Sequence, residues 1–206
     1  MVFLIISFPA IAQFSTGSFV GLNFGKLTGD APKGGYYMPN HGLNAGVMID
    51  IPVSREIKLS LQPSYSQEGT KVYYSQGKYV EPIDSIQLRL NYFSLPLMIK
   101  VQSLNKHFYA VGGLEAGFLS GYKLTSHEQL LSNQLSVAKF NLAAHFGAGY
   151  RIFLGYPVLF IELRYAQGLI NLTDEPVDKS YVPRVKTSGM KFLIGIELPL
   201  SKQEKQ

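Results

Sequence analysis

Apolar and polar residues alternate with a period of two along most of this chain, and this pattern constrains the fold more than any other feature. In segment 43–51, for example, Leu43 and Val47 fall on one parity and Asn44 on the other. Successive side chains of a β-strand point to opposite faces, so the pattern predicts strands with one apolar face. Helical periodicity is almost absent. Eight strands are expected, at 20–25, 43–51, 57–65, 86–101, 108–120, 140–151, 159–165 and 190–198.

The apolar parity changes once, within segment 86–101. The apolar residues have even numbers from Ile86 to Tyr92 and odd numbers from Leu95 to Val101. A β-bulge shifts the parity of a strand in this way, so we expect a bulge near Phe93 and Ser94. The bulge brings Arg89 and Lys100 onto the same polar face.

The connections between the expected strands alternate in length. Short connections are expected at 54–56, 103–106 and 154–157, and long ones at 26–42, 67–85, 122–138 and 168–188. Tight periplasmic turns and longer outer loops are typical of outer-membrane barrels. The prediction is an all-β fold, an eight-stranded antiparallel up-and-down transmembrane β-barrel, with both termini in the periplasm of a Gram-negative bacterium.

Period two alone does not show which face points outward, so a soluble lipocalin-like barrel is the structural alternative. Only 16% of the residues are charged, against about 25% in soluble proteins. The polar face of the expected strands is rich in glycine, which suits a crowded lumen: Gly21, Gly25, Gly46, Gly113, Gly117, Gly147, Gly149 and Gly195. The apolar parity carries aromatic residues toward strand ends, as interfacial girdles do: Tyr65, Tyr92, Phe118, Phe140 and Tyr165 at the loop side, Phe108 and Tyr150 at the turn side. The low charge, the glycine-rich polar face and the aromatic residues at the strand ends all favour the membrane barrel.

The first residues resemble a secretory leader. Residues 1–12 combine a short apolar segment with Ala10, Ile11 and Ala12, a pattern that signal peptidases cut. We expect cleavage before Gln13, a leader whose basic beginning lies upstream, and a barrel domain at 13–206. The alternative, a buried first strand, fits poorly with Pro9.

Three strings resemble the PorT-like outer-membrane β-barrel family of Bacteroidota. They are VGLNFGKLTGD at 20–30, NYFSLPLMIKVQ at 91–102 and IELRYAQGLINLTDE at 161–175, in the first, fourth and seventh expected strands. The Leu-Pro-Leu and Lys of the second string and the Leu-Arg-Tyr of the third carry most of the match. The resemblance implies an eight-stranded outer-membrane barrel. Some family members are accessories of the type IX secretion system, and most have no assigned activity.

The sequence contains no convincing catalytic, metal or nucleic-acid site. The acid, base and nucleophile candidates of the expected loops lie on different loops without paired spacing, as solvated loop residues do: His41, His127, Asp30, Asp84, Ser126 and Asp174. The four histidines lack a metal-ligand spacing, and the net charge of +5 comes from scattered Lys and Arg residues. We expect no enzyme activity, no cofactor and no nucleic-acid partner.

Two groups of residues are the candidate sites. Five tyrosines of the first two long connections form either a contact surface or a lipid-boundary cluster: Tyr36, Tyr37, Tyr73, Tyr74 and Tyr79. Counting from the turns places four charged or titratable residues at similar height inside the barrel, with Lys191 nearby: Glu115, His145, Glu162 and Arg164. This lumen cluster is interpreted as a salt-bridge plug, and alternatively as a proton- or ligand-responsive gate.

The expected function is that of a membrane-embedded scaffold or interaction barrel. Its partners are outer-membrane lipid and, in one hypothesis, other envelope or secretion proteins, in the service of secretion or surface assembly. The alternative is a narrow pore or a transporter of a small apolar ligand. Eight strands leave an interior about filled by side chains, which disfavours a general diffusion pore. The oligomeric state stays open.

Overall fold

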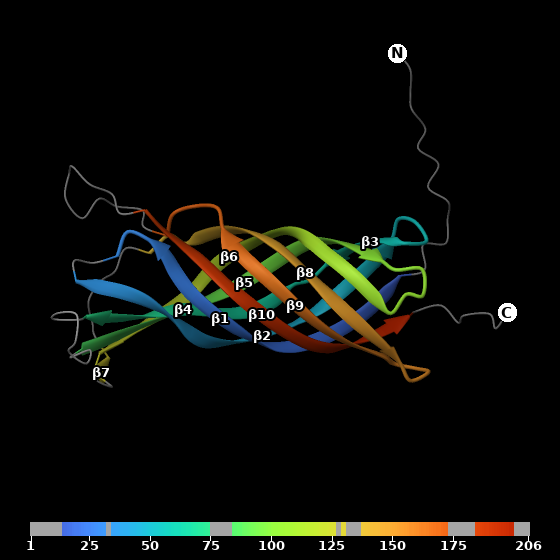
Figure 1. The fold of residues 1–206 in the computed structure, drawn as a ribbon, viewed down its shortest axis with the longest axis horizontal. Helices are drawn as coiled ribbons and strands as arrows, with labels where there is room; N and C mark the ends of the chain where they lie inside the picture. The colour runs from blue at the N-terminus through green and yellow to red at the C-terminus, as the bar shows by residue number, and fades with distance from the viewer. Residues whose placement is uncertain are drawn as a thin grey trace, which may run out of the picture.

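The computed structural model describes residues 14–31, 34–74, 84–126, 129–130, 137–172 and 184–199, and they form one antiparallel β-sheet that closes into a barrel (Figure 1). The expected leader at 1–12 lies outside the described residues. The strands are β1 Ser15–Gly29, β2 Gly35–Pro52, β3 Ile57–Leu61, β4 Ser64–Tyr74, β5 Asp84–Gln102, β6 Phe108–Ser126, β7 Gln129–Leu130, β8 Phe140–Phe153, β9 Val158–Gly168 and β10 Val185–Pro199.

The barrel is a ring of eight strands. Around the ring, β1 pairs with β2, β2 with β3 and β4, these with β5, β5 with β6, β6 with β8, β8 with β9, β9 with β10, and β10 with β1. β3 and β4 are two parts of one barrel strand, since both pair with β2 and with β5. β7 is a two-residue extension paired with the end of β6. The predicted fold class is confirmed, and closure leaves no sheet edge to expose unpaired backbone groups to lipid.

The break between β3 and β4 has a cause in the sequence. Pro63 has no backbone N–H and cannot donate to the ladder. Pro96, on the neighbouring β5, lies at the same point of the sheet. The carbonyls of both prolines remain in use: the Gln62 amide donates to Pro96 O at 3.0 Å, and the Val47 amide donates to Pro63 O at 3.1 Å. The ladder therefore resumes on both sides of the break.

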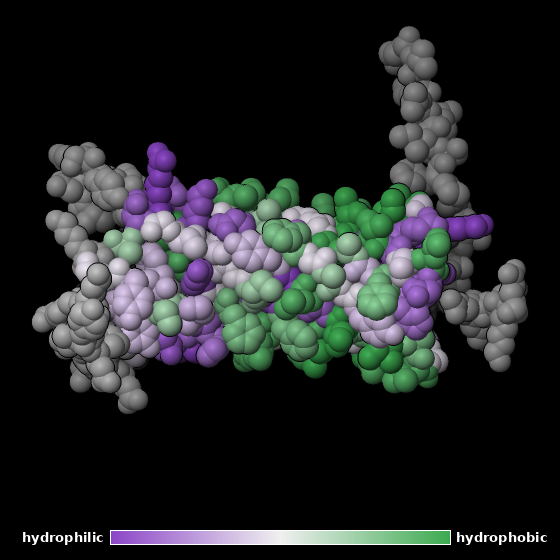
Figure 2. All heavy atoms as spheres, in the orientation of Figure 1, coloured by the Kyte–Doolittle hydropathy of each residue, from purple (hydrophilic) through white to green (hydrophobic). Residues whose placement is uncertain are grey.

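The two ends of the barrel differ. At one end, here called the turn end, the strands join through residues 53–56, 103–107 and 154–157; at the other, the loop end, they join through 30–34, 75–83, 127–139 and 169–184. The predicted alternation holds for three of the four loop-end connections. The connection 30–34 has five residues, no more than 103–107, because β1 and β2 reach further at the loop end than expected. Most of the predicted loop 26–42 belongs to β1 and β2. At the loop end the strands thus continue beyond the apolar part of the outer wall (Figure 2).

The apolar face points outward and the charged face inward. Val20 and Leu43 are 56% and 59% exposed, whereas Asp50, Lys100 and Glu162 are almost fully buried inside. Hydrophobic residues cover much of the wall in Figure 2, and hydrophilic ones gather toward the loop end. A lipocalin-like barrel has the reverse arrangement, with an apolar interior and a solvated outer face. The outer face is therefore suited to lipid contact.

Strand β5 differs from the prediction. Its alternation is continuous: Leu90 and Tyr92 are 0% and 1% exposed and point inward, while Phe93 is 62% exposed. The predicted bulge near Phe93 and Ser94 is wrong. The register shift lies between Asn91 and Tyr92, opposite an additional residue in β6.

This correction changes two further assignments. Tyr92 is not a girdle residue, because it belongs to an apolar cluster inside the barrel. Arg89 does not share the inner face of Lys100, and it pairs instead with the exposed Lys123. The sequence misled here because the lumen is apolar at this height, so that the apolar Tyr92 faces inward while the polar Arg89 faces outward.

The other predicted girdle residues lie on the outer wall. Phe118 and Phe140 are exposed neighbours with ring centroids 5.4 Å apart, and Phe108 contacts Tyr150 at 4.8 Å at the turn end. Tyr65 and Tyr165 are half-buried against Phe93 and Phe146.

Glycines make room for large side chains inside the barrel. A Cβ atom at Gly195 would lie 2.6 Å from Cζ of Phe160, and one at Gly149 would enter the ring of Tyr109. Both rings are buried in the lumen. The predicted interleaving of glycine and bulky residues is therefore present, and it fills the space that eight strands enclose.

Arginine at mid-wall should destabilise the protein if the outer face touches lipid. Ile161 and Ile194 are paired across β9 and β10 and are 42% and 46% exposed. Ile161→Arg or Ile194→Arg is expected to lower the free energy of unfolding in lipid vesicles by about 2–4 kcal/mol. Equilibrium denaturant titration of the vesicle-embedded protein measures this loss.

The matched control is Leu104→Arg, because Leu104 is 92% exposed in a turn at the turn end and should tolerate the change. Gly42 is not a suitable control: it is buried in β2, and a Cβ there would lie 2.8 Å from the Gln67 carbonyl carbon. Equal stability of all three variants would contradict lipid contact.

Candidate functional site

Among the side chains that the structure describes, the lumen contains as many acidic as basic ones. Five carboxylates face it from the strands, as do five cationic groups: Asp50, Glu68, Glu115, Glu162 and Glu197, with Lys58, Lys100, Arg151, Arg164 and Lys191. All are buried except the half-buried Lys58. Since an unpaired charge in such a space is strongly unfavourable, the charges should occur in contact. They do so in three groups along the barrel.

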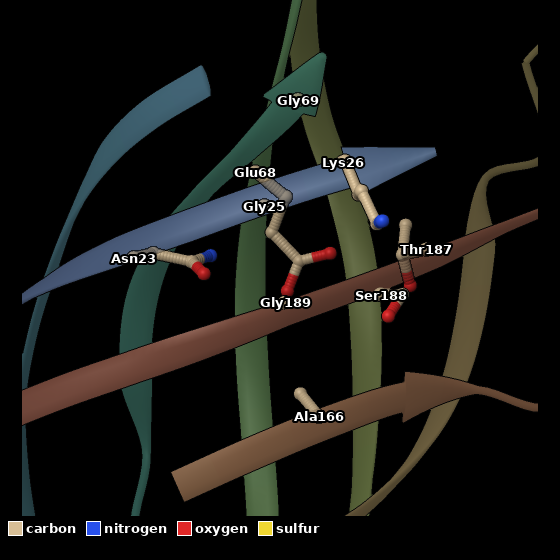
Figure 3. Close-up of a pocket in the computed structure, with 9 residues that line it drawn as sticks. All are labelled: Asn23, Gly25, Lys26, Glu68, Gly69, Ala166, Thr187, Ser188 and Gly189. Atoms are coloured by element: carbon tan, nitrogen blue, oxygen red, sulfur yellow. The ribbon is translucent and has the colours of Figure 1, made fainter. Parts of the chain in front are cut away.

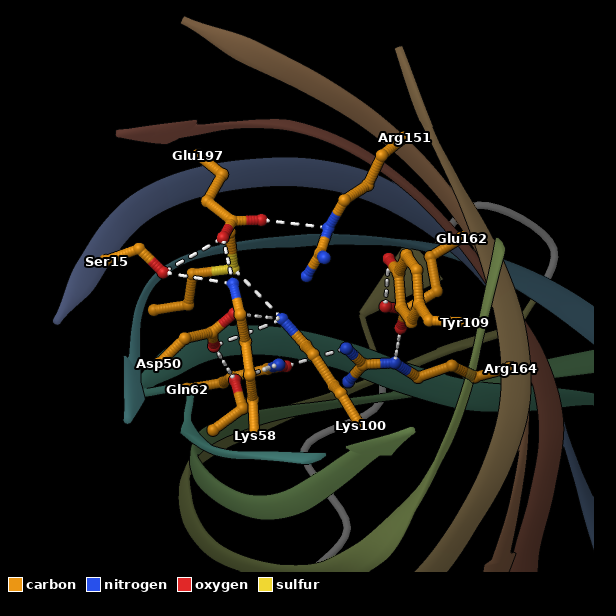
Figure 4. A network of polar contacts seen from close by, with 12 residues as sticks. Ser15, Asp50, Lys58, Gln62, Lys100, Tyr109, Arg151, Glu162, Arg164 and Glu197 are labelled. Atoms are coloured by element: carbon orange, nitrogen blue, oxygen red, sulfur yellow. Dashed lines mark hydrogen bonds and ion pairs between the residues drawn. The ribbon is translucent and has the colours of Figure 1, made fainter. Parts of the chain in front are cut away.

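The turn-side group joins the two ends of the barrel domain. Lys58 Nζ lies 2.6 Å from Glu197 Oε1, and Arg151 Nε lies 3.0 Å from Glu197 Oε2. The hydroxyl of Ser15 donates to Glu197 Oε1 at 2.9 Å. Side chains of three strands, β1, β3 and β8, thus converge on one carboxylate of β10 (Figure 4).

The central group begins with a buried ion pair between β2 and β5. Lys100 Nζ donates to both oxygens of Asp50, at 2.9 and 3.1 Å, and the Ser60 hydroxyl donates to the same carboxylate. Gln62 Nε2 donates to Ser60 Oγ at 2.8 Å. All four side chains are nearly inaccessible to solvent.

Gln62 connects this pair to the opposite wall. Arg164 Nη2 donates to Gln62 Oε1 at 2.7 Å, and Arg164 Nε forms an ion pair with Glu162. Tyr109 Oη donates to the other Glu162 oxygen at 2.7 Å. The central group therefore crosses the barrel from β2 to β9, as Figure 4 shows. Described side chains therefore bridge the lumen at this height.

The loop-side group is built around Lys191. Its ammonium lies 3.0 Å from Glu115 Oε2 and 3.4 Å from Glu68 Oε1. Ser94 Oγ donates to Glu115 Oε1 at 2.9 Å. His145 Nε2 is 3.2 Å from Glu115 Oε2, but neither ring nitrogen makes a hydrogen bond of good geometry with the described residues.

A pocket and an apolar cluster lie between this group and the loop end. Figure 3 shows the pocket, with the Glu68 carboxylate among its lining residues Asn23, Gly25 and Thr187. Glu68 Oε2 has no hydrogen-bond partner among the described residues. The buried cluster consists of Leu27, Leu90, Tyr92, Leu172 and Val185.

The five residues predicted to form the lumen cluster all face the lumen, but in two groups. Glu115, His145 and Lys191 belong to the loop-side group, and Glu162 and Arg164 to the central one. The predicted single height is wrong because neighbouring strands are offset along the barrel. His145 pairs with Ala166, whereas Glu162 pairs with Gly149, nearer the turn end.

Several charged residues of these three groups are not part of the predicted lumen cluster. Glu68 was assigned to a loop, although β4 carries it into the lumen beside Lys191. Asp50, Lys58 and Lys100 lie on the inward face of their strands and belong to the other two groups. A charged residue on the polar face of a predicted strand indicates a side chain in the lumen. It does not indicate which residue of another strand pairs with it.

Most of the predicted tyrosine surface lies on strands. Tyr36 of β2 and Tyr73 of β4 are paired, with stacked rings 5.9 Å apart, and Tyr36 is exposed. Tyr37 packs against the apolar cluster, and its hydroxyl donates to Asp30 O at 2.9 Å. Tyr74 ends β4, and Tyr79 lies outside the described residues. The loop assignment was wrong for the four described tyrosines because β2 and β4 extend past the apolar wall.

The described acid, base and nucleophile candidates are not brought together in one site. His41 lies on β2 against the ring of Phe24, Asp30 follows β1, and Asp84 and Ser126 are at the ends of β5 and β6. His127 and Asp174 lie outside the described residues. Within the described ranges, no group of three or more His, Asp or Glu side chains could hold a metal ion.

Comparison with known proteins identifies a family. A family model described as outer membrane protein beta-barrel domain matches residues 8–174. Among solved structures, Ail of Yersinia pestis is 16% identical, with 91% of this chain and 100% of that chain covered and a TM-score of 0.47. OprG of Pseudomonas aeruginosa is 15% identical, covers 91% and 95%, and has a TM-score of 0.42. No curated protein matches this chain.

The central group supports a stability prediction. Arg164→Ala removes the cation that neutralises the buried Glu162 and is expected to lower the free energy of unfolding by about 3–5 kcal/mol. Glu162→Gln in the same chain should restore part of this loss, because the stranded charge is then absent. Thermal and denaturant unfolding in detergent measure both variants. If single and double variants melt like the parent, the ion pair does not contribute to stability.

Proposed function

This chain belongs to the outer membrane protein beta-barrel domain family, and we propose that it is a closed scaffold barrel whose loop end contacts another envelope protein. Its place is the outer membrane of a Gram-negative bacterium. The proposal concerns what the barrel does there, beyond crossing the bilayer.

The observation that carries the proposal is the filled lumen. Three ionic groups cross the described part of the interior, and an apolar cluster packs inside the loop end. Ions and polar solutes cannot pass such layers without separating buried ion pairs, which is unfavourable. A barrel that does not conduct can still act through the surface that it presents.

The orientation follows from the barrel ends. Outer-membrane barrels have short periplasmic turns and longer outer loops, so we place the turn end in the periplasm. Ser15, at the start of β1, and Pro199, at the end of β10, pair at this end. Both termini are then periplasmic, in agreement with a cleaved leader at residues 1–12.

The PorT-like resemblance supports a role near secretion or surface assembly. Its three strings fall on β1, β5 and β9, the first, fourth and seventh strands of the barrel. In this proposal the chain is an accessory that positions or anchors a partner at the outer membrane. The extended hairpin walls at the loop end provide the surface, and the stacked Tyr36 and Tyr73 lie on it.

Conductance tests the closed lumen directly. The purified full chain, inserted in planar bilayers, should give no stable open channels, with a general porin as positive control. Channels of porin size would remove the scaffold proposal. Small, reproducible currents would favour the alternative of a narrow pore.

The contact surface can be tested by paired substitutions. Tyr36→Ala with Tyr73→Ala should abolish recovery of a crosslinked envelope partner from native membranes, because exposed aromatics contribute much of an interface's binding energy. The matched control is Phe108→Ala with Tyr150→Ala, which removes an aromatic pair from the turn end. Equal recovery from parent and tyrosine variant would reject this surface.

A further inference from the structure

Five basic residues project from the outer wall just beyond its apolar part at the loop end. Lys26 follows Phe24 by two positions on β1, and Arg89 lies four positions past Phe93 on β5. These five residues, here called the basic belt, are Lys26, Lys71, Arg89, Lys123 and Lys186, on β1, β4, β5, β6 and β10. Each is half-buried or exposed.

The basic belt has no acidic counterpart among the described side chains of the wall. The described carboxylate side chains of the strands all point into the lumen, where they are paired with lumen cations. None of the five belt residues forms an ion pair with another described residue. The lumen charges balance, so the net charge of +5 lies outside it.

Arg89 and Lys123 are the centre of the belt. They are directly opposite in the pairing of β5 with β6, an arrangement in which like charges destabilise a sheet. Arg89 Nε is buried without a hydrogen-bond partner among the described residues. Lys71 lies on the next strand, with its register partner Gln87 two residues from Arg89. An anion bound here would relieve the repulsion and accept from the guanidinium.

The height of the belt indicates where that anion comes from. A strand residue rises about 3.3 Å, and barrel strands tilt by about 35–45°, so each residue adds about 2.5 Å along the membrane normal. Two to four residues place the belt about 5–10 Å beyond the last lipid-facing side chains. Headgroups occupy this depth in a bilayer.

We propose that the basic belt, centred on Arg89 and Lys123, binds the phosphate headgroup of an anionic lipid in the leaflet that surrounds the loop end. Basic side chains near a membrane surface gain binding energy from anionic lipid. The bound lipid fixes the height of the barrel in the bilayer and shields the repulsion between β5 and β6. The centre of the belt lies on β5 and β6, whereas the stacked tyrosine pair lies on β2 and β4, next to Lys71.

Lipid binding to the full chain tests the proposal. The protein in zwitterionic micelles is titrated with dioleoyl phosphatidic acid, with dioleoyl phosphatidylcholine or with inorganic phosphate, and bound lipid is counted by native mass spectrometry. The parent should bind phosphatidic acid about tenfold or more tightly than phosphatidylcholine. Arg89→Gln with Lys123→Gln should lose most of this preference, and Arg89→Lys should retain most of it.

The matched control removes the same charge from the turn end. Arg55→Gln with Lys106→Gln changes two exposed turn residues and should keep the preference of the parent. Without anionic lipid, the belt variant should melt at or above the parent temperature, because it has lost a repulsion. If it fails to fold, Lys71→Gln with Lys123→Gln replaces it.

Three results would overturn the proposal. One is a parent that does not distinguish the two lipids. Another is a turn-end control that loses as much preference as the belt variant. The third is competition by inorganic phosphate at concentrations similar to phosphatidic acid, which would indicate a small-anion site without lipid selectivity.

Discussion

The rest of the structure depends on one constraint, that a narrow barrel lumen cannot hold an unpaired charge. Closure of the sheet satisfies the backbone, and the outer wall is apolar over much of its height. Charged side chains on the strands must therefore face the lumen or lie beyond the apolar wall. Inside, five carboxylates meet five cations, and each carboxylate has a cationic neighbour within 4.0 Å. Breaking one pair would leave the other partner in a space with little water, which makes the interior rigid.

These pairs also define the topology, because they join strands that are distant in sequence. Glu197 on the last strand holds Lys58 of β3 and Arg151 of β8, while Gln62 links Arg164 to the opposite wall. Each contact requires the correct register on both strands, and a shift by one residue would turn a charge toward lipid. The polar lumen therefore specifies the register that the uniformly apolar outer face leaves undefined.

The fold could be predicted from alternation, but the lumen contacts could not. Strict alternation in β2, β8, β9 and β10 assigned Asp50, His145, Glu162 and Lys191 to the inner face correctly. It failed at Tyr92, because the lumen at that height is filled by an apolar cluster and the apolar side of β5 is there the inner one. The predicted heights of the lumen residues along the barrel were also wrong. Counting from the turns ignores the offset between tilted strands, so it places Glu162 beside Glu115. Which side chains meet across the lumen depends on how the sheet closes into a barrel. Local sequence patterns do not determine this.

The separation of charge by face has a further consequence for function. Nineteen basic and fourteen acidic residues give the chain its net charge, and removing five of each for the lumen leaves the excess unchanged. The lumen is therefore neutral as a whole, with one cation in excess in the turn-side group and one carboxylate in excess in the loop-side group. The outer wall and the connections carry the excess, so charged partners should meet the barrel from outside. A barrel built in this way is suited to hold position in a membrane and to display its loop end, and its interior serves mainly to keep that wall rigid.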